Sequence, residues 1–225
     1  MDLIKGVICG VLISLLFSFT VRGQVTYHIS GAAPADVRYI LLSDVATHQV
    51  LDSCFTSKGA FQFEGTLPEN TFVNLSDSWH ELDATLIIDD TPTIVDMENN
   101  YVRGSELNEK FNEYYRQLLR LQVNVISDYR HREELLSDTT RVADRQKVER
   151  SIQLQLENIT AVEKGIVDAN MGNIISAYFL RDLSADLTLN ELRGYLNEHY
   201  PYREHPILYP AQQRLRELET LNVKR

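Results

Sequence analysis

Cysteine is scarce in this 225-residue chain, which has only Cys9 and Cys54. Cys9 lies in an apolar segment near the N-terminus, so a chain that loses this segment keeps one thiol and cannot form an internal disulfide. No Cys-x-x-Cys pair is present, which excludes a self-contained dithiol centre. The folded chain must therefore be stabilised by packing.

Motifs of the common catalytic classes are also missing. The six histidines never show His-x-x-x-His spacing, no serine lies in Gly-x-Ser-x-Gly, and there is no glycine-rich phosphate loop. These absences argue against zinc hydrolases, serine hydrolases and nucleotide-binding proteins. Basic residues are outnumbered, 22 against 32 acidic ones, and the net charge of −10 argues against a nucleic-acid or anionic-membrane partner.

The segment 1–23 is predicted to be a secretory signal peptide. Residues 6–19 carry no charge, Lys5 precedes them, and the small residue Gly23 ends the segment. The apolar run is shorter than the roughly 20 residues that a membrane span needs. Cys9 lies inside this run rather than after it, which disfavours lipid attachment. We therefore expect an exported protein of the periplasm or cell envelope, with an uncleaved anchor as the alternative.

Residues 24–103 show the short alternating and β-branched runs that are typical of strands, in a chain with globular composition (44% hydrophobic, 24% charged). Turn residues such as Ser57-Lys58-Gly59 separate the runs. Strands are expected over residues 25–29, 37–42, 50–55, 60–64, 71–75, 85–88 and 93–97. Seven short strands without room for crossover helices predict an antiparallel β-sandwich or partial barrel, as the first part of an α+β fold.

In residues 104–225 the apolar period becomes helical. Ser105 is expected to cap a long helix, and an interruption at 138–140 separates it from a second one. The stripe of the first helix comprises Leu107, Phe111, Tyr114, Leu118, Leu121, Val125 and Tyr129, and that of the second comprises Val148, Ile152, Leu156, Ile159, Val162 and Ile166. The matched stripes predict an antiparallel helical hairpin packed on or beside the sandwich. Three shorter helices are expected after Asn173, after the capping-box pair Thr188 and Glu191, and at Pro210.

Short motifs in both parts of the chain match one known family. They are Ile29-Ser30-Gly31, Asp52-Ser53, residues 59–65 (GAFQFEG), residues 102–108 (VRGSELN), and Asn170 with Asn173-Ile174-Ile175 and Tyr178. On these motifs, most of residues 24–200 resembles the β-sandwich-plus-helices domain of unknown function that precedes thioredoxin-like domains in exported Gram-negative proteins. The resemblance implies the accessory module alone, since no residue matches the thioredoxin active site. It also implies a thioredoxin-like protein as one candidate partner.

Cys54 has two interpretations. It lies in an expected strand beside Asp52, whose negative charge favours the thiol over the thiolate, so a small buried apolar residue is expected. The alternative is a reactive thiol that forms a mixed disulfide with a thioredoxin-like partner.

Two carboxylate motifs could suggest metal binding. Asp128 and His131 have the spacing found in bundle di-metal sites, but the second such pair and the inward glutamates are missing. Asp89-Asp90 lacks the patterned loop that calcium requires and is expected to form a polar turn. We predict neither a metal nor another cofactor.

Tyrosine is abundant, with 11 residues, most of them in the helical part. Tyr114 and Tyr178 lie on apolar stripes and are expected to pack in the core. Tyr200, Tyr202 and Tyr209 are flanked by prolines and charges, and they are predicted as a contact surface.

These observations favour an exported, non-catalytic accessory module that binds another envelope protein, or a second copy of itself through the helices. Two alternatives remain open. The first is a redox role that uses Cys54 together with a partner's thiol. The second is a small-ligand site inside the sandwich, which would need a wide apolar cavity.

Overall fold

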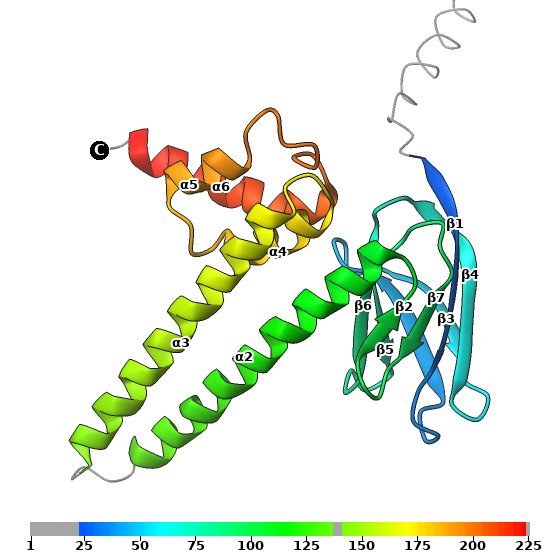
Figure 1. The fold of residues 1–225 in the computed structure, drawn as a ribbon, viewed down its shortest axis with the longest axis horizontal. Helices are drawn as coiled ribbons and strands as arrows, with labels where there is room; N and C mark the ends of the chain where they lie inside the picture. Colours follow the sequence, from blue (N-terminus) through cyan, green and yellow to red (C-terminus); the bar gives the residue numbers. More distant parts are fainter. Residues whose placement is uncertain (1–22, 137–140, 224–225) are drawn as a thin grey trace, which may run out of the picture.

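The computed structural model describes residues 23–136 and 141–223, so the expected signal segment before Gly23 and the interruption at 138–140 lie outside the described residues. A β-sandwich, a helical hairpin that extends away from it, and a group of shorter helices at the base of the hairpin form the molecule (Figure 1). None of the described helices is long and apolar enough to cross a membrane.

The strands of the described residues form two four-stranded sheets, which confirms the expected sandwich in an α+β fold. Sheet A has the order β4 (Ala60–Pro68), β1 (Gln24–Ala32), β7 (Thr93–Asp96) and β8 (Tyr101–Arg103). Sheet B has the order β3 (Val50–Phe55), β2 (Tyr39–Asp44), β5 (Phe72–Asp77) and β6 (Asp83–Ile87). The sheets are not closed into a barrel.

Two features of the sheets differ from the sequence-based expectation. The three-residue strand β8 was not expected, because it is too short to show alternation. The pairing is also not wholly antiparallel, since β7 runs parallel to β1, with Ile29 opposite Thr93 and Ala32 opposite Asp96. The chain completes sheet B before β7 returns to sheet A, so tertiary packing rather than a local turn sets this pairing.

Alternating side chains fill the space between the sheets. Phe61 and Phe63 point inward, with 5% and 2% of their surface exposed, whereas Gln62 between them is exposed. Gly31 is required opposite Phe61, because a Cβ there would collide with the Phe61 ring and with the carbonyl oxygen of Val95. The positions that face inward on β2, β5 and β6 are likewise aliphatic and buried.

The helices are α2 (Glu106–Leu136), α3 (Val142–Ala169), α4 (Ile175–Leu183), α5 (Leu189–Tyr195), the 3-10 turn η2 (Pro206–Leu208) and α6 (Tyr209–Val223). The expected caps are confirmed. Asn108 donates its backbone N–H to Ser105 Oγ at 3.2 Å, and Thr188 and Glu191 form a capping box.

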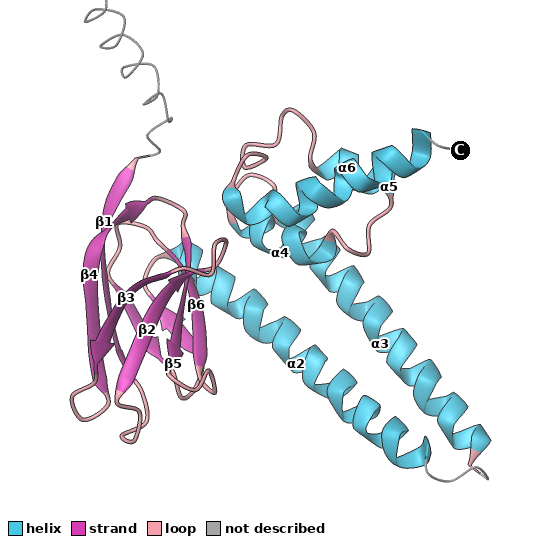
Figure 2. Ribbon diagram, turned by 180° about the vertical axis from the view of Figure 1, so that it is seen from behind, coloured by secondary structure: helices cyan, strands magenta, loops and turns pink. Residues whose placement is uncertain are grey.

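Helices α2 and α3 form the expected antiparallel hairpin, and they lie side by side in both views (Figures 1 and 2). The apolar stripes meet at Leu118, Val125, Ile152 and Ile159, which are buried. The expected seam is wrong at two positions, Tyr129 and Leu156, which are 37% and 38% exposed.

Two asparagines on the first turns of α2 bind the edge strands of the two sheets. Asn108 is fully buried; its Oδ1 accepts from the Ile87 N–H at 2.8 Å, and its Nδ2 donates to the Ile87 carbonyl at 2.8 Å. One turn later, Asn112 Oδ1 accepts from the Val102 N–H at 3.3 Å. Helix α2 therefore supplies hydrogen-bond partners to the otherwise open edges of β6 and β8.

A second apolar core joins the helices to sheet B. Phe72 and Ile87 point out of the sandwich and belong to this core together with Phe111 on α2 and Tyr178 on α4. The Phe72 ring lies 5.6 Å from Phe111 and 5.1 Å from Tyr178 between centroids. The prediction that Tyr178 packs in the core is confirmed by its 7% exposure. The helical layer is thus packed on the outer face of sheet B.

Candidate functional site

A polar cleft lies where the outer face of sheet B meets the helices. Strand register places two rows of side chains on this face, Ser43–Asn74–Thr85 and Leu41–Ser76–Asp83, each running across β2, β5 and β6. The row before them, Phe72 and Ile87, is covered by the helices. The outer face of sheet B therefore changes from apolar to polar at the edge of the helical layer.

Helices α2 and α4 form one wall of this cleft, which has a volume of ≈ 420 Å³. Tyr115 comes from α2, and Tyr178 and Arg181 come from α4. The Tyr115 hydroxyl donates to Asp83 Oδ2 at 3.2 Å, which ties α2 to the end of β6. The volume lies within the range of about 300–1,000 Å³ that is common for small-ligand sites.

The positive charge in the cleft is already paired. Arg181 Nε and Nη2 donate to the two carboxylate oxygens of Asp182 at 2.7 and 2.8 Å, and the guanidinium lies over the Tyr178 ring, 4.5 Å from its centroid. Burial alone would lower the pKa of Arg181, but the bond to the Asp182 carboxylate raises it above its usual range. Arg181 is thus a fixed cation with a local counter-ion.

Both tyrosines in the cleft are held in the neutral form. Burial raises the pKa of Tyr178, and burial together with the negative charge of Asp83 raises the pKa of Tyr115. A neutral phenol both donates and accepts hydrogen bonds, so the Tyr115 hydroxyl, which already donates to Asp83, can still accept a hydrogen bond.

Two tight turns complete the cleft, and each carries a histidine with positive φ: His48 at 58° and His80 at 56°. An aspartate shapes each turn. Asp44 Oδ1 accepts from the Thr47 N–H at 2.7 Å, and buried Asp77 accepts from the N–H groups of residues 79, 81 and 82. These amide bonds lower the pKa of Asp77 although burial opposes them.

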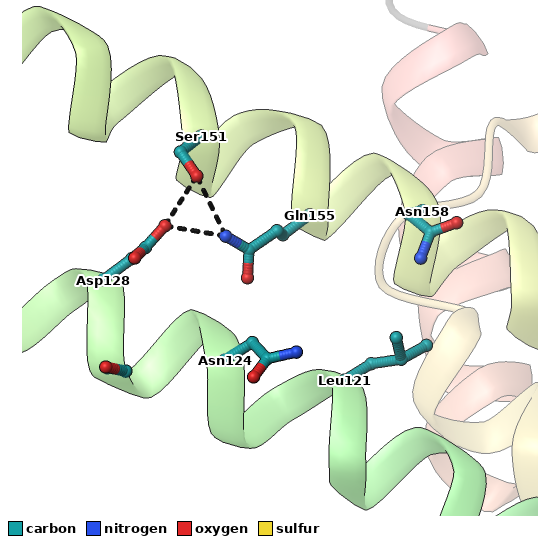
Figure 3. Close-up of a pocket in the computed structure, with 7 residues that line it drawn as sticks. Leu121, Asn124, Asp128, Ser151, Gln155 and Asn158 are labelled. Atoms are coloured by element: carbon teal, nitrogen blue, oxygen red, sulfur yellow. Dashed lines mark hydrogen bonds between the residues drawn. The ribbon is translucent and has the colours of Figure 1, made fainter.

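The hairpin contains a second polar site, between α2 and α3 (Figure 3). Asp128 Oδ2 on α2 accepts from Ser151 Oγ at 2.6 Å and from Gln155 Nε2 at 2.7 Å, both on α3. Asn124 on α2 and Asn158 on α3 also line this pocket of ≈ 490 Å³. Buried Leu135 lies nearer the hairpin tip, so the pocket is a polar interruption between apolar contacts.

A half-buried carboxyl group on α3 makes stability depend on pH. Burial, with the negative charges of Asp182 and Asp186, raises the pKa of Glu163 to about 7 from the ordinary 4.5. The folded state therefore binds more protons between these values, so this group destabilises the fold progressively as pH rises from about 4.5 to about 7.

We expect Glu163→Gln to remove this pH dependence. At pH about 8 the variant should be more stable than the unchanged protein by about 1 kcal/mol, a figure reduced for partial solvent screening. This corresponds to a rise of about 2–4 °C in Tm, whereas at pH about 4.5 the Tm values should coincide. Thermal unfolding at both pH values measures the effect, and Glu157→Gln, an exposed site on the same helix, is the control. Equal shifts at both pH values would contradict the assignment.

Cys54 is half-buried on β3, and its thiol accepts a hydrogen bond from the backbone of Gln62. Burial and the charge of Asp52 raise its pKa, although the bond from Gln62 opposes this. This environment favours the thiol over the thiolate. The structure does not bring Cys54 together with the cleft residues.

The three tyrosines predicted as a contact surface lie in different surroundings. Tyr200 is 4% exposed, and its hydroxyl lies 2.7 Å from that of Ser176, so it belongs to the core of the helical layer. Tyr202 is half-buried and packs against this core. Tyr209 is 59% exposed, and it alone of the three offers most of its surface to a partner.

The two carboxylate motifs have structural roles here. Asp128 faces α3, whereas His131 lies 3.4 Å from Glu134 on its own helix, so the two do not converge. Asp89 accepts from Ser105 Oγ and from the Thr91 N–H, as expected for a polar turn that leads into α2. Within residues 23–136 and 141–223, no three His, Cys, Asp or Glu side chains are grouped so that they could hold a metal ion.

Sequence reasoning missed the cleft. Its residues come from β2, β5, β6, two turns and two helices, and they share no local spacing. The only local signal was the polar residues at alternate positions of β5, Asn74 and Ser76, which read as an ordinary solvent-exposed face.

Comparison with known protein families and with curated proteins finds no match to this chain. Its function is accordingly inferred from the geometry.

Proposed function

We propose that this chain is an exported, non-catalytic interaction module of the cell envelope that binds another protein through its helical hairpin. One observation carries the proposal: Leu119, Val123 and Ile126 on α2 are 40%, 57% and 50% exposed. We call these three residues the hairpin stripe. Their spacings of four and three residues place them on one face of the helix.

The position of the hairpin stripe suits a docking surface. The hairpin projects away from the sandwich (Figure 2), so a partner can approach it without touching the sheets. Another face of α2 is already occupied by α3, through Leu118 and Val125. Aliphatic side chains that cluster on an exposed helix face, rather than occurring singly, are typical of protein-binding surfaces.

Two features of the sequence support export and an envelope protein as the partner. The apolar segment 1–23 supports export, and the resemblance to domains that accompany thioredoxin-like proteins supports an envelope protein as partner. A second copy of this chain is the other candidate partner for the hairpin stripe. The redox alternative has less support, because burial and Asp52 raise the pKa of Cys54.

The test compares two variants in pull-downs from envelope extract. The triple change Leu119→Gln, Val123→Gln and Ile126→Gln should reduce the recovery of the specific partner about tenfold or more, since it removes the buried apolar contact. Leu154→Gln, at a 60% exposed site on α3, is the matched control and should leave recovery unchanged. Quantitative mass spectrometry measures recovery, and sedimentation velocity tests self-association of the same proteins.

The proposal is wrong if two results are found together. The triple variant would recover every protein that the unchanged chain recovers, in equal amounts, and its sedimentation velocity would equal that of the unchanged chain.

A further inference from the structure

The outer face of sheet B continues beyond the cleft to a pair of aromatic rings. Alternation along β2 places Tyr39 and Leu41 on the same face as Ser43, and Tyr39 is opposite Phe55 on β3. The two rings lie 5.1 Å apart between centroids, and Phe55 is 80% exposed. One surface therefore joins a polar cleft to an exposed aromatic platform.

The length of this surface exceeds that of one sugar-sized ligand. Ser43 and Tyr39 are four residues apart on one strand, a distance of about 13 Å. A ligand that contacts both the cleft and the Tyr39–Phe55 platform must be extended.

The charges on this surface exclude a strongly anionic ligand. Asp44 and Asp83 contribute carboxylates to the cleft, whereas the guanidinium of Arg181 is already paired with Asp182. The net charge of the whole chain, −10, also repels an anionic ligand. An anionic ligand is therefore disfavoured, which leaves neutral and cationic ligands.

The remaining lining groups suit a ligand with many hydroxyls. Asn74 and Tyr115, both half-buried at the cleft, donate and accept hydrogen bonds, and carboxylates accept from hydroxyl groups. Thr85 Oγ1 donates to Asn74 Oδ1 at 3.2 Å, which fixes the orientation of that amide before a ligand arrives. The apolar C–H face of a sugar ring can in turn stack on an aromatic ring, as Phe55 offers.

We propose that the open part of the outer face of sheet B binds a neutral oligosaccharide. Hydroxyls of one end bond to Asn74 and Asp83 in the cleft, and a ring further along the chain stacks on Tyr39 and Phe55. This binding site is separate from the hairpin stripe. The oligosaccharide proposal can therefore be tested independently of the proposal that the hairpin stripe binds a protein.

The experiment is isothermal titration calorimetry with neutral gluco-, xylo- and manno-oligosaccharides and with an oligogalacturonate as the acidic probe. We expect at least one neutral probe to bind with a Kd between about 1 μM and 1 mM, and the acidic probe to bind about tenfold more weakly or not at all. The single tryptophan, Trp79, adjoins His80 in the cleft turn, so its emission should change on binding.

Two variants and a matched control locate the site. Phe55→Ala should weaken binding about tenfold or more, and because Phe55 is 80% exposed the variant should fold normally. Asp83→Asn, at an exposed position, should weaken binding as well. Ile94→Ala, at a 60% exposed position on the other sheet, should bind as the unchanged protein does.

Three results would overturn the proposal. They are the absence of binding for every neutral probe, an equal or higher affinity for the acidic probe, and equal affinities for the Phe55→Ala and Ile94→Ala variants.

Discussion

Replacing Phe111 by alanine is expected to lower the free energy of unfolding by about 3–5 kcal/mol. Phe111 is fully buried, and its ring lies 5.6 Å from Phe72, 4.9 Å from Tyr178 and 5.8 Å from Phe179. The change removes one of the side chains that join α2, α4 and sheet B, and it leaves a cavity that these rigid rings cannot fill.

Urea unfolding followed by far-UV circular dichroism measures this loss. Leu119→Ala is the control on the same helix, because Leu119 is 40% exposed and should change stability by no more than about 0.5 kcal/mol. A loss below about 1 kcal/mol for Phe111→Ala would mean that helices and sheet are not joined through this ring.

Replacing Asn108 by alanine is expected to cost about 2–4 kcal/mol, although it removes few atoms. The buried amide makes two hydrogen bonds of 2.8 Å to the backbone of Ile87, one to its N–H and one to its carbonyl. Alanine leaves both backbone groups buried without a partner, and each such group costs about 1–3 kcal/mol.

Equilibrium unfolding gives the size of this effect, and hydrogen exchange gives its location. The Ile87 amide should exchange much faster in Asn108→Ala than in the unchanged protein, since its acceptor is lost. Asn190→Ala, at an exposed site on α5, should leave both measurements unchanged within about 0.5 kcal/mol. Unaltered exchange at Ile87 would show that Asn108 does not bind the edge of β6.

Local pattern predicted most elements of the fold, because burial imposes a period on each strand and helix. Alternation located seven of the strands, and the helical stripes identified the hairpin. The parallel contact of β7 with β1 joins segments some 60 residues apart, and no local signal records such a contact. Asn108 and Asn112 lie beside the apolar stripe of α2 and read as solvent-facing, because their partners are backbone groups of distant strands.

The surfaces were harder to predict than the elements. The helical period places Leu118, Leu121 and Val125 on the core side of α2, and the aliphatic residues of the hairpin stripe lie off that side. What the structure adds is that nothing among the described residues covers the hairpin stripe enough to bury it, since its three side chains are 40–57% exposed. The cleft could not be predicted because it exists only where two layers meet, and neither layer contains it alone.

The asparagine contacts of α2 also determine where an independently folding piece of this chain can end. A fragment cut after the last strand, at Arg103, would lack Asn108 and Asn112. The edges of β6 and β8 would then have unpaired backbone groups that could pair with a strand of another molecule. A fragment that contains the complete sandwich should therefore end within α2, after its second turn. Any transfer of the sandwich to another protein would have to carry the beginning of α2 with it.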